Sequence, residues 1–392
     1  MNRLVIAATA SLLLAGCASA PKPADDLHRR LLTLDTHLDT PMHFGRAGWS
    51  FGARHDYADD LIQVDLARMD AGDLDGGFFV IYTAPGPLDA EGYAKALAFA
   101  RARMELIRAT VAQFPGRIAL ATRADDAARL DAAGKRFAYI SMENSYPLGE
   151  DLGLLREFYQ RGLRMAGPVH TKNNQFADSS TDKPQWHGLS PLGREWVAQM
   201  NRLGLVIDAS HASDEAFDQM LALSRTPLIL SHSGSRTIWD HPRNLDDARL
   251  RKLAAAGGVV SVTTVYLATM NLSPEREALF DKLEHIATAT PAEQATLIAD
   301  TRALDKTRPL WDQDFEGFMK SLLHLIEVVG VDHVAFGGDW DGGGGLRGME
   351  DITALPKVTA RLRAAGYSEA DLEKMWSGNV LRLLRAAEAA RE

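Results

Sequence analysis

Eight apolar runs, rich in β-branched and aromatic residues, recur along most of the chain. Between them lie amphipathic stretches rich in Ala, Leu and Arg, which favour helices. Strands that alternate with helices form parallel sheets, and eight such units predict an α/β fold of the (β/α)8 TIM-barrel type. The predicted strands are Leu31–Asp39, Gly77–Thr83, Phe137–Glu143, Leu163–His170, Leu205–His211, Pro227–His232, Val259–Tyr266 and His333–Asp339.

One connection is much longer than the others. About 65 residues separate the last two predicted strands, and a connection of that length commonly has a function of its own. The segment 267–332 is therefore expected to form a lid or an insertion, and it contains a predicted helix at Phe315–Val329. Helix boundaries elsewhere carry local signals: Ser190 and Pro191 provide a cap and a first helical residue ahead of Gly193–Leu203.

The first 20 residues are typical of a secretory signal. A basic start precedes an apolar stretch that is too short to span a membrane. Residues 14–17, Leu-Ala-Gly-Cys, resemble the lipobox of bacterial lipoproteins, in which the cysteine becomes the lipidated first residue. Cleavage after Ala20 is the alternative, but Cys17 is the only cysteine of the chain. We therefore expect an extracytoplasmic, membrane-anchored lipoprotein on the periplasmic side, with a secreted protein as the alternative and residues 21–30 as a tether.

Length and charge limit the remaining possibilities. About 370 residues follow the leader, enough for one barrel with insertions, and no Pro/Gly/Ser-rich linker divides them. Residues 31–392 are therefore predicted to be a single barrel domain. The net charge is −9 and there is no run of Lys or Arg, which argues against nucleic acid as a partner. A single cysteine excludes an intramolecular disulfide and a thiolate zinc site. The sequence is compatible with a homodimer.

Several predicted strands end in a side chain that can bind a metal ion. In the first, Asp35-Thr36-His37-Leu38-Asp39 places an imidazole and two carboxylates at alternate positions, which share one face of a strand. Chemistry in such barrels is located at the carboxyl ends of the strands. Each residue alone is unremarkable, but together they predict one site there, made of His37, Asp39, Glu143, His170, His211, His232 and Asp339.

This residue set suits two zinc ions better than one. A bridging carboxylate can hold two cations ~3.5–4 Å apart with a nucleophilic hydroxide between them. Glu143 is the predicted bridge. His37 and Asp39 would complete the shell of one ion, and His211 and His232 that of the other. His170 remains to polarise a substrate carbonyl, and Asp339 to move protons to the leaving amine.

The residues around these positions resemble the membrane (renal-type) dipeptidase family of zinc metallopeptidases. The resemblance extends from about Leu31 to the C-terminus and rests on five segments in this order: DTHLDTP, VHTKNNQFADSS, HGLSPLGREWVAQMNRLGLVIDASHAS, LSHSGSRTIWDHPRN and VAFGGDWDGGGG. It implies an amidohydrolase-type barrel with two Zn²⁺ ions that hydrolyses dipeptides, often with a D-residue on the C-terminal side. It also implies the metal and proton-transfer roles given above, contact of His170 with the scissile carbonyl side, and binding of the terminal carboxylate by Arg243.

Two features depart from the family. Glycines commonly follow the bridging glutamate, whereas this chain has Asn144 and Ser145, so the local shape of the pocket is left open. Residues 261–270 and the long connection after them align poorly, and the preferred dipeptide side chains cannot be read. Two alternatives also stay open: another amidohydrolase reaction, on a lactam or an N-acyl amino acid, and a non-catalytic binding lipoprotein. The set His170, Arg243 and Asp339 argues against pure binding, which needs no proton transfer.

Overall fold

The computed structural model describes residues 27–55 and 60–392. The predicted signal, Cys17 and most of the predicted tether therefore lie outside the described residues. Among those that are described, no helix has both the length and the apolar character required to cross a membrane.

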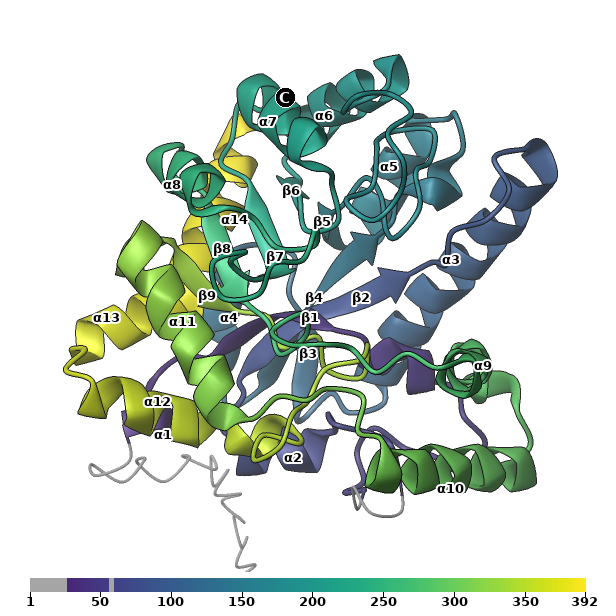
Figure 1. Cartoon of the computed structure of the whole chain (residues 1–392), viewed down its shortest axis with the longest axis vertical. Coiled ribbons are helices and arrows are strands. Elements are labelled where there is room, and N and C mark those ends of the chain that lie inside the picture. Colours follow the sequence, from purple (N-terminus) through teal and green to yellow (C-terminus); the bar gives the residue numbers. More distant parts are fainter. Residues whose placement is uncertain (1–26, 56–59) are drawn as a thin grey trace, which may run out of the picture.

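Parallel strands form the centre of the molecule (Figure 1). Hydrogen bonds join them in the order β6-β5-β4-β2-β1-β9-β8-β7, and a parallel bridge between Asp208 and Ile229 connects the two ends of this path. The predicted (β/α)8 barrel is thereby confirmed, because each of the eight predicted runs overlaps one of its strands. The strands are β1 (Leu34–Leu38), β2 (Gly76–Tyr82), β4 (Arg136–Glu143), β5 (Leu163–Ala166), β6 (Val206–Ile207), β7 (Ile229–Ser233), β8 (Val259–Val262) and β9 (Val334–Phe336). One further strand, β3 (Ile118–Leu120), pairs with β4 off this path and was not predicted.

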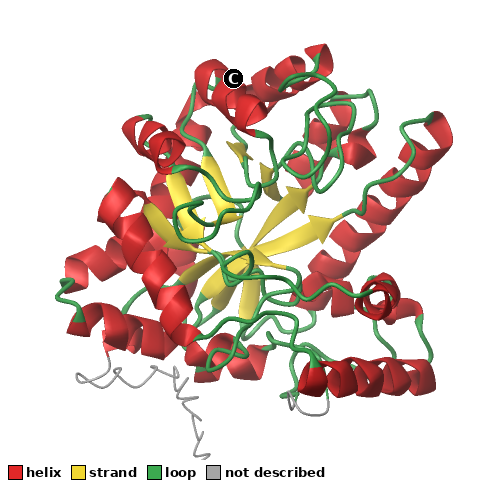
Figure 2. Ribbon diagram, in the orientation of Figure 1, coloured by secondary structure: helices red, strands yellow, loops and turns green. Residues whose placement is uncertain are grey.

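Helices surround the strands, and loops cross in front of them (Figure 2). Both boundary predictions are confirmed: a helix spans Phe315–Val329, and Ser190 caps the helix that begins at Pro191 by accepting a hydrogen bond from the backbone N–H of Gly193. The helices are α1 (Leu27–Arg30), α2 (Leu66–Ala71), α3 (Ala90–Ala112), α4 (Asp126–Ala132), α5 (Gly153–Arg161), α6 (Pro191–Leu203), α7 (Asp214–Leu223), α8 (Asp247–Ala255), α9 (Pro274–Leu283), α10 (Pro291–Thr307), α11 (Phe315–Val329), α12 (Leu355–Ala364), α13 (Glu369–Glu373) and α14 (Asn379–Ala390). Shorter helical turns are η1 (Thr40–His43), η2 (Tyr146–Leu148), η3 (Ile286–Thr288), η4 (Val331–His333), η5 (Ile352–Ala354) and a π-helical turn, η6 (Lys374–Gly378).

Alternation along β4 shows how the barrel positions its site. Phe137 and Tyr139 belong to one buried cluster, which also contains the early residues of other strands and the apolar face of α14. Ala138 and Ile140 belong to a second cluster, shared with the surrounding helices. Because strand residues alternate between faces, Glu143 lies on the same face as Phe137 and Tyr139, at the carboxyl end. The amino end of the barrel is therefore filled with apolar side chains, and polar residues are left for the other end.

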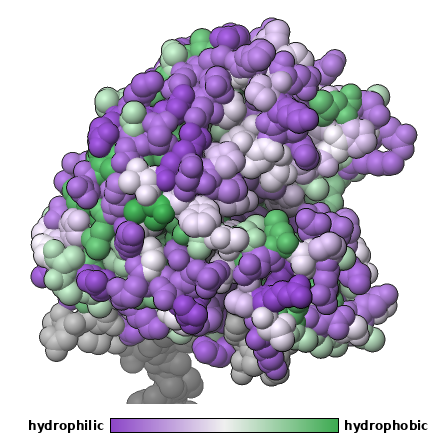
Figure 3. Space-filling view, viewed as in Figure 1, coloured by the Kyte–Doolittle hydropathy of each residue, from purple (hydrophilic) through white to green (hydrophobic). Residues whose placement is uncertain are grey.

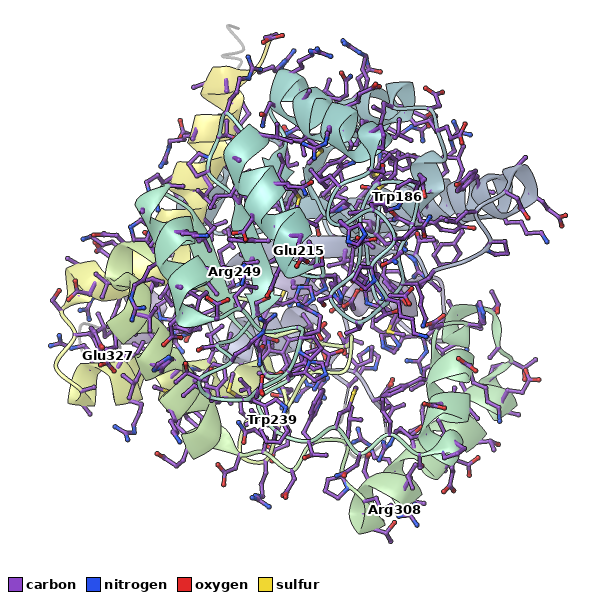
Figure 4. The ribbon with its side chains drawn as sticks, turned by 45° about the horizontal axis from the view of Figure 1, so that its top comes forward. Trp186, Glu215, Trp239, Arg249, Arg308 and Glu327 are labelled. Carbon is purple, nitrogen blue, oxygen red and sulfur yellow. The ribbon has the colours of Figure 1, made fainter. Side chains whose placement is uncertain are left out.

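The long connection between β8 and β9 has two parts. Its last helix, α11, packs against α8, β8 and β9 as an ordinary helix of the barrel wall. The earlier helices, α9 and α10, pack mainly on each other and have a small apolar cluster of their own, formed by Leu279, Ile286, Leu297 and Leu304. We call α9 and α10 with the turns between them, residues 274–307, the lobe. Figure 4 shows the lobe apart from the wall helices, with Arg308 at its end and Glu327 of α11 on the other side of the molecule.

Candidate metal centre and substrate pocket

The carboxyl ends of the barrel strands bring the predicted site residues together. His37 and His232 lie within β1 and β7, and Glu143 is the last residue of β4. Asp39, His170, His211 and Asp339 follow β1, β5, β6 and β9 within a few residues. All of these side chains are buried except that of His170, which is partly exposed.

Glu143 lies at the centre of this group, and its two carboxylate oxygens face different partners. Oε1 is 2.7 Å from Nε2 of His211 and 3.5 Å from Nε2 of His232. Oε2 is 3.4 Å from Nε2 of His37. His170 approaches the first oxygen, with 3.6 Å between its Nε2 and Oε1. One carboxylate is thus shared by two groups of imidazoles, as a bridging ligand must be.

Two further carboxylates surround His37. Its Nε2 is 3.2 Å from Oδ2 of Asp39 and 3.7 Å from Oδ1 of Asp339. Together with Glu143 these residues form overlapping sets whose donor atoms lie within 4.8 Å of one another: His37/Glu143/His232, Glu143/His170/His211 and His37/Asp39/Asp339.

The donor atoms fit divalent cations. Nε2 of His37 is fully buried, yet it makes no hydrogen bond within the described residues. Nε2 of His211 and Nε2 of His232 point at each other at 3.0 Å, an arrangement in which only one of them can carry a proton. Imidazole nitrogens and carboxylate oxygens converging in this way are ligands suited to Zn²⁺ and similar ions.

Burial and neighbouring charges shift the pKa values of the site. Burial holds the pKa of His211 and His232 well below the ordinary value, and the positive charge of Arg243 acts in the same direction. Burial alone would lower the pKa of His37, but the carboxylates of Glu143 and Asp39 raise it well above its usual range. Burial, reinforced by the charges of Asp39 and Glu143, raises the pKa of Asp339 despite the opposing effect of His37. The neutral form favoured at His211 and His232 is the one that binds a metal ion, and the raised proton affinity of Asp339 suits proton transfer.

A hydrogen-bond network behind the imidazoles orients two of them. Ser231 Oγ donates its only proton to Oδ2 of Asp208 at 2.5 Å. The same oxygen can therefore only accept from the two imidazoles, from Nδ1 of His232 at 2.9 Å and from Nδ1 of His37 at 3.4 Å. Asp208 also accepts from the hydroxyl of Ser210 at 2.6 Å. A proton on Nδ1 leaves the Nε2 lone pair free for a metal ion. Sequence reasoning missed these partners, although each stands within three residues of a predicted ligand.

Two residues near the ligands have structural roles. The carboxylate of Asp35 does not join the donor cluster: it accepts from the backbone N–H groups of His37 and Gly338 and from Nε1 of Trp340, which ties β1 to the loop carrying Asp339. Asn144 has φ +68°, a left-handed conformation that glycine and asparagine adopt more readily than other residues. The departure from glycine after Glu143 therefore preserves the backbone path.

Arg243 is not among the residues that line the pocket. It is buried, and its guanidinium donates to the backbone carbonyls of Ser210 and His232, with a longer bond to the hydroxyl of Ser233 at 3.4 Å. Its Cζ lies 5.3 Å from the ring centroid of Tyr266. In this structure Arg243 ties the loop that carries His211 to β7, which carries His232.

A pocket of about 740 Å³ opens above the cluster. Glu143, His170, His211 and Asp339 form part of its floor, α3 lines one side, and α9 lines another. The surface of the face shown in Figure 3 is largely hydrophilic. Among the large apolar side chains that stay exposed in the described part of the chain, Phe99 and Leu272 both line this pocket. A pocket of this size and partly apolar lining matches a small organic ligand.

Comparison with known proteins agrees with this geometry. Residues 22–392 match the family model described as membrane dipeptidase (peptidase family M19). The chain is 30% identical to dipeptidase tcpJ of Claviceps purpurea over 364 residues, 90% of this chain and 76% of that protein.

Solved structures agree with the family model. The probable dipeptidase PvdM of Pseudomonas aeruginosa is 30% identical with a TM-score of 0.79, covering 93% of this chain and 97% of that one. A metallopeptidase of Rhodobacter sphaeroides, solved with a phosphinate mimic of the dipeptide L-Ala-D-Ala, is 26% identical with a TM-score of 0.72, covering 91% of this chain and 99% of that one. The chain belongs to the membrane dipeptidase family, peptidase family M19, and is a metallo-dipeptidase.

Proposed function

We propose that this metallo-dipeptidase uses two zinc ions held on either side of Glu143. The observation that carries the proposal is the division of the carboxylate, with Oε2 toward His37 and Oε1 toward His211 and His232. His37 and Asp39 would hold one ion, and His211 and His232 the other. When bound, the ions would supply Lewis acidity and lower the pKa of a bound water.

The protein's own groups would then position the substrate and move protons. His170 is the one partly exposed imidazole of the cluster and lines the pocket, so it can donate to the carbonyl of the scissile bond. Asp339 also lines the pocket, and its raised pKa suits a group that accepts a proton and passes it to the departing amine. Arg243 is proposed to bind the terminal carboxylate, since its buried Nε has no hydrogen-bond partner among the described residues.

The proposed substrates are dipeptides, including those with a C-terminal D-residue. Support comes from the Rhodobacter sphaeroides relative, whose structure contains a mimic of L-Ala-D-Ala.

We also propose that Cys17 is lipidated and anchors the enzyme to a membrane. This proposal rests on the leader sequence. A Cys17→Ala variant should move from the membrane fraction to the soluble fraction, and a variant that stays membrane-bound would show that another segment is the anchor.

The decisive experiment combines metal analysis with a substrate panel. Purified protein, loaded with zinc and freed of excess ion, should contain two zinc ions per chain by elemental analysis. It should hydrolyse dipeptides of the L,L and L,D series and leave N-acyl amino acids and lactams intact. One tightly bound ion would contradict the binuclear centre, and turnover confined to acyl amino acids or lactams would contradict the proposed substrate class.

A further inference from the structure

The helix α3 presents a basic stripe to the pocket. Lys95, Phe99 and Arg103 are spaced four residues apart, so they lie on one face of the helix, and all three line the pocket. Lys95 is exposed and its ammonium pairs with Glu91 at 2.6 Å. Arg103 lies deeper, where only 7% of its surface is exposed. The stripe thus ends in a buried guanidinium near the metal ligands.

Arg103 lacks an acidic partner. Its Nη1 donates to the backbone carbonyl of Pro41, and its Cζ lies 5.2 Å from the ring centroid of Phe99. Within the described residues no carboxylate comes within ion-pair distance of it. Buried Arg46 and Arg68 each have one, whereas buried Arg164 and Arg243 also have none, but neither of those two lines the pocket. A guanidinium has five N–H donors, and Pro41 takes up a single one. Arg103 makes no other hydrogen bond among the described residues, so its remaining donors can bind a ligand in the pocket that it lines.

A buried cation without a counter-charge is expensive to maintain. Burial lowers the pKa of Arg103 to about 10, with Asp39 acting in the opposite direction, so the side chain remains charged at neutral pH. Asp39 is itself a proposed metal ligand and its charge would be taken up by the ion. An anion brought by the substrate would supply the missing counter-charge, and a carboxylate can accept two parallel N–H bonds from a guanidinium.

We propose that Arg103 is a second carboxylate-binding group of the substrate pocket, in addition to the proposed role of Arg243. The inference rests on the proposed dipeptidase function and names a group that the resemblance does not assign. The carboxylate has two sources in a dipeptide, an acidic side chain and the C-terminus. If Arg103 binds an acidic side chain, dipeptides that contain Asp or Glu should be preferred substrates. If it binds the C-terminus, Arg103 would hold the terminal carboxylate that is otherwise proposed to bind Arg243.

The test compares Arg103→Met with the matched control Arg101→Met. Arg101 lies on the same helix, is 43% exposed and pairs with Glu157 outside the pocket. The panel pairs Ala-Glu with Ala-Gln, Glu-Ala with Gln-Ala, and Ala-Ala with its C-terminal amide, each in L,L and L,D forms. In each pair the first peptide carries a carboxylate that the second lacks. For the pair whose carboxylate Arg103 binds, Arg103→Met should lower kcat/KM of the acidic peptide by roughly 10- to 100-fold and leave kcat/KM of the neutral peptide unchanged. Arg103→Lys should recover part of the loss, and Arg101→Met should leave every ratio unchanged.

Each result has one meaning. A loss confined to Glu against Gln assigns the acidic side chain, and a loss confined to the free acid against the amide assigns the C-terminus. Equal losses on acids and amides, or no loss, would overturn the proposal and leave Arg103 as a support for the carbonyl of Pro41. If the wild-type enzyme hydrolysed no dipeptide, the proposed function would fail. Calorimetric affinities for Ala-Glu against Ala-Gln, and for Ala-Ala against its C-terminal amide, in wild type and Arg103→Met, would then still decide the role of Arg103.

Discussion

The metal end of the barrel and the lobe of residues 274–307 meet at the same pocket but are held in different ways. The proposed ligands lie on or just after strands that are hydrogen-bonded to neighbours on both sides, above an extensive apolar core. The lobe has a cluster of only four buried apolar residues, separate from that core. Local stability increases with the amount of buried apolar contact. The proposed metal ligands therefore lie on the rigid barrel, whereas one wall of the pocket is formed by the less stable lobe. Substitutions in the barrel and in the lobe should therefore have different effects on metal binding and on the substrate pocket.

The largest expected effect comes from Glu143→Gln at the centre of the rigid part. The amide keeps the shape of the side chain but replaces one of the two carboxylate oxygens that face the imidazoles. We expect metal content well below two per chain and loss of measurable turnover, checked by elemental analysis and a dipeptide assay. His333→Ala is the control: its Nδ1 bonds the carbonyl of Gly258 at the other end of the barrel, so metal content should not change. Two tightly bound zinc ions in Glu143→Gln would contradict the bridging role.

Asp339→Asn should separate chemistry from metal binding. Asp339 has φ +59°, which asparagine tolerates, so the backbone should be kept. Losing a general acid–base group should lower kcat by about 10²-fold or more, with KM and metal content little changed. Steady-state kinetics and metal analysis on the same preparation test this. Asp332→Asn, an exposed position before β9, should behave as wild type. A near-normal kcat in Asp339→Asn would transfer the proton role to another residue.

Ser231→Ala tests whether the network behind the imidazoles matters. It removes the hydroxyl between Asp208 and the Nδ1 atoms of His232 and His37. Loss of such an outer partner typically costs 10- to 100-fold in metal affinity, so the zinc dissociation constant should rise by roughly that factor. Ser261→Ala is a matched control on β8, because its buried hydroxyl has no hydrogen-bond partner among the described residues. Equal zinc affinities in the two variants would show that Ser231 does not orient the ligands.

The same division explains what the sequence could predict. Glu143 and His232 could be placed because each ends an apolar run, and parallel strands end together. The hydrogen bond between Asp208 and Ser231 could not be predicted from the sequence. It forms where β6 meets β7, and so it depends on closure of the barrel. β3 was missed because a strand of three residues carries little periodicity.

The substrate side was harder to predict than the metal side. Arg103 sits on a helix whose pocket-facing side is set by tertiary packing, and nothing in the local pattern around it marks that side. The role of Arg243 in binding the terminal carboxylate stays a prediction from the resemblance, and its bonds in this structure go to the backbone carbonyls of Ser210 and His232. The insertion was predicted as one segment, whereas α11 belongs to the barrel wall.

The smallest effect on the chemistry is expected from Leu297→Ala in the lobe. Leu297 lies in α10 and is 6% exposed within the four-residue cluster. Truncating a buried leucine typically costs about 2–5 kcal/mol, and here the cost should fall on the lobe alone, because its cluster is separate from the barrel core. The lobe should become sensitive to protease within residues 274–307 and KM should rise several-fold, since α9 lines the pocket. Zinc content and the main unfolding temperature should stay at wild-type values.

The matched control is Leu384→Ala, in the apolar cluster at the amino end of the barrel, which should lower the main unfolding temperature. If Leu297→Ala lost zinc as readily as it gained protease sensitivity, the lobe and the metal centre would form one cooperative unit, and the contrast between them would be wrong.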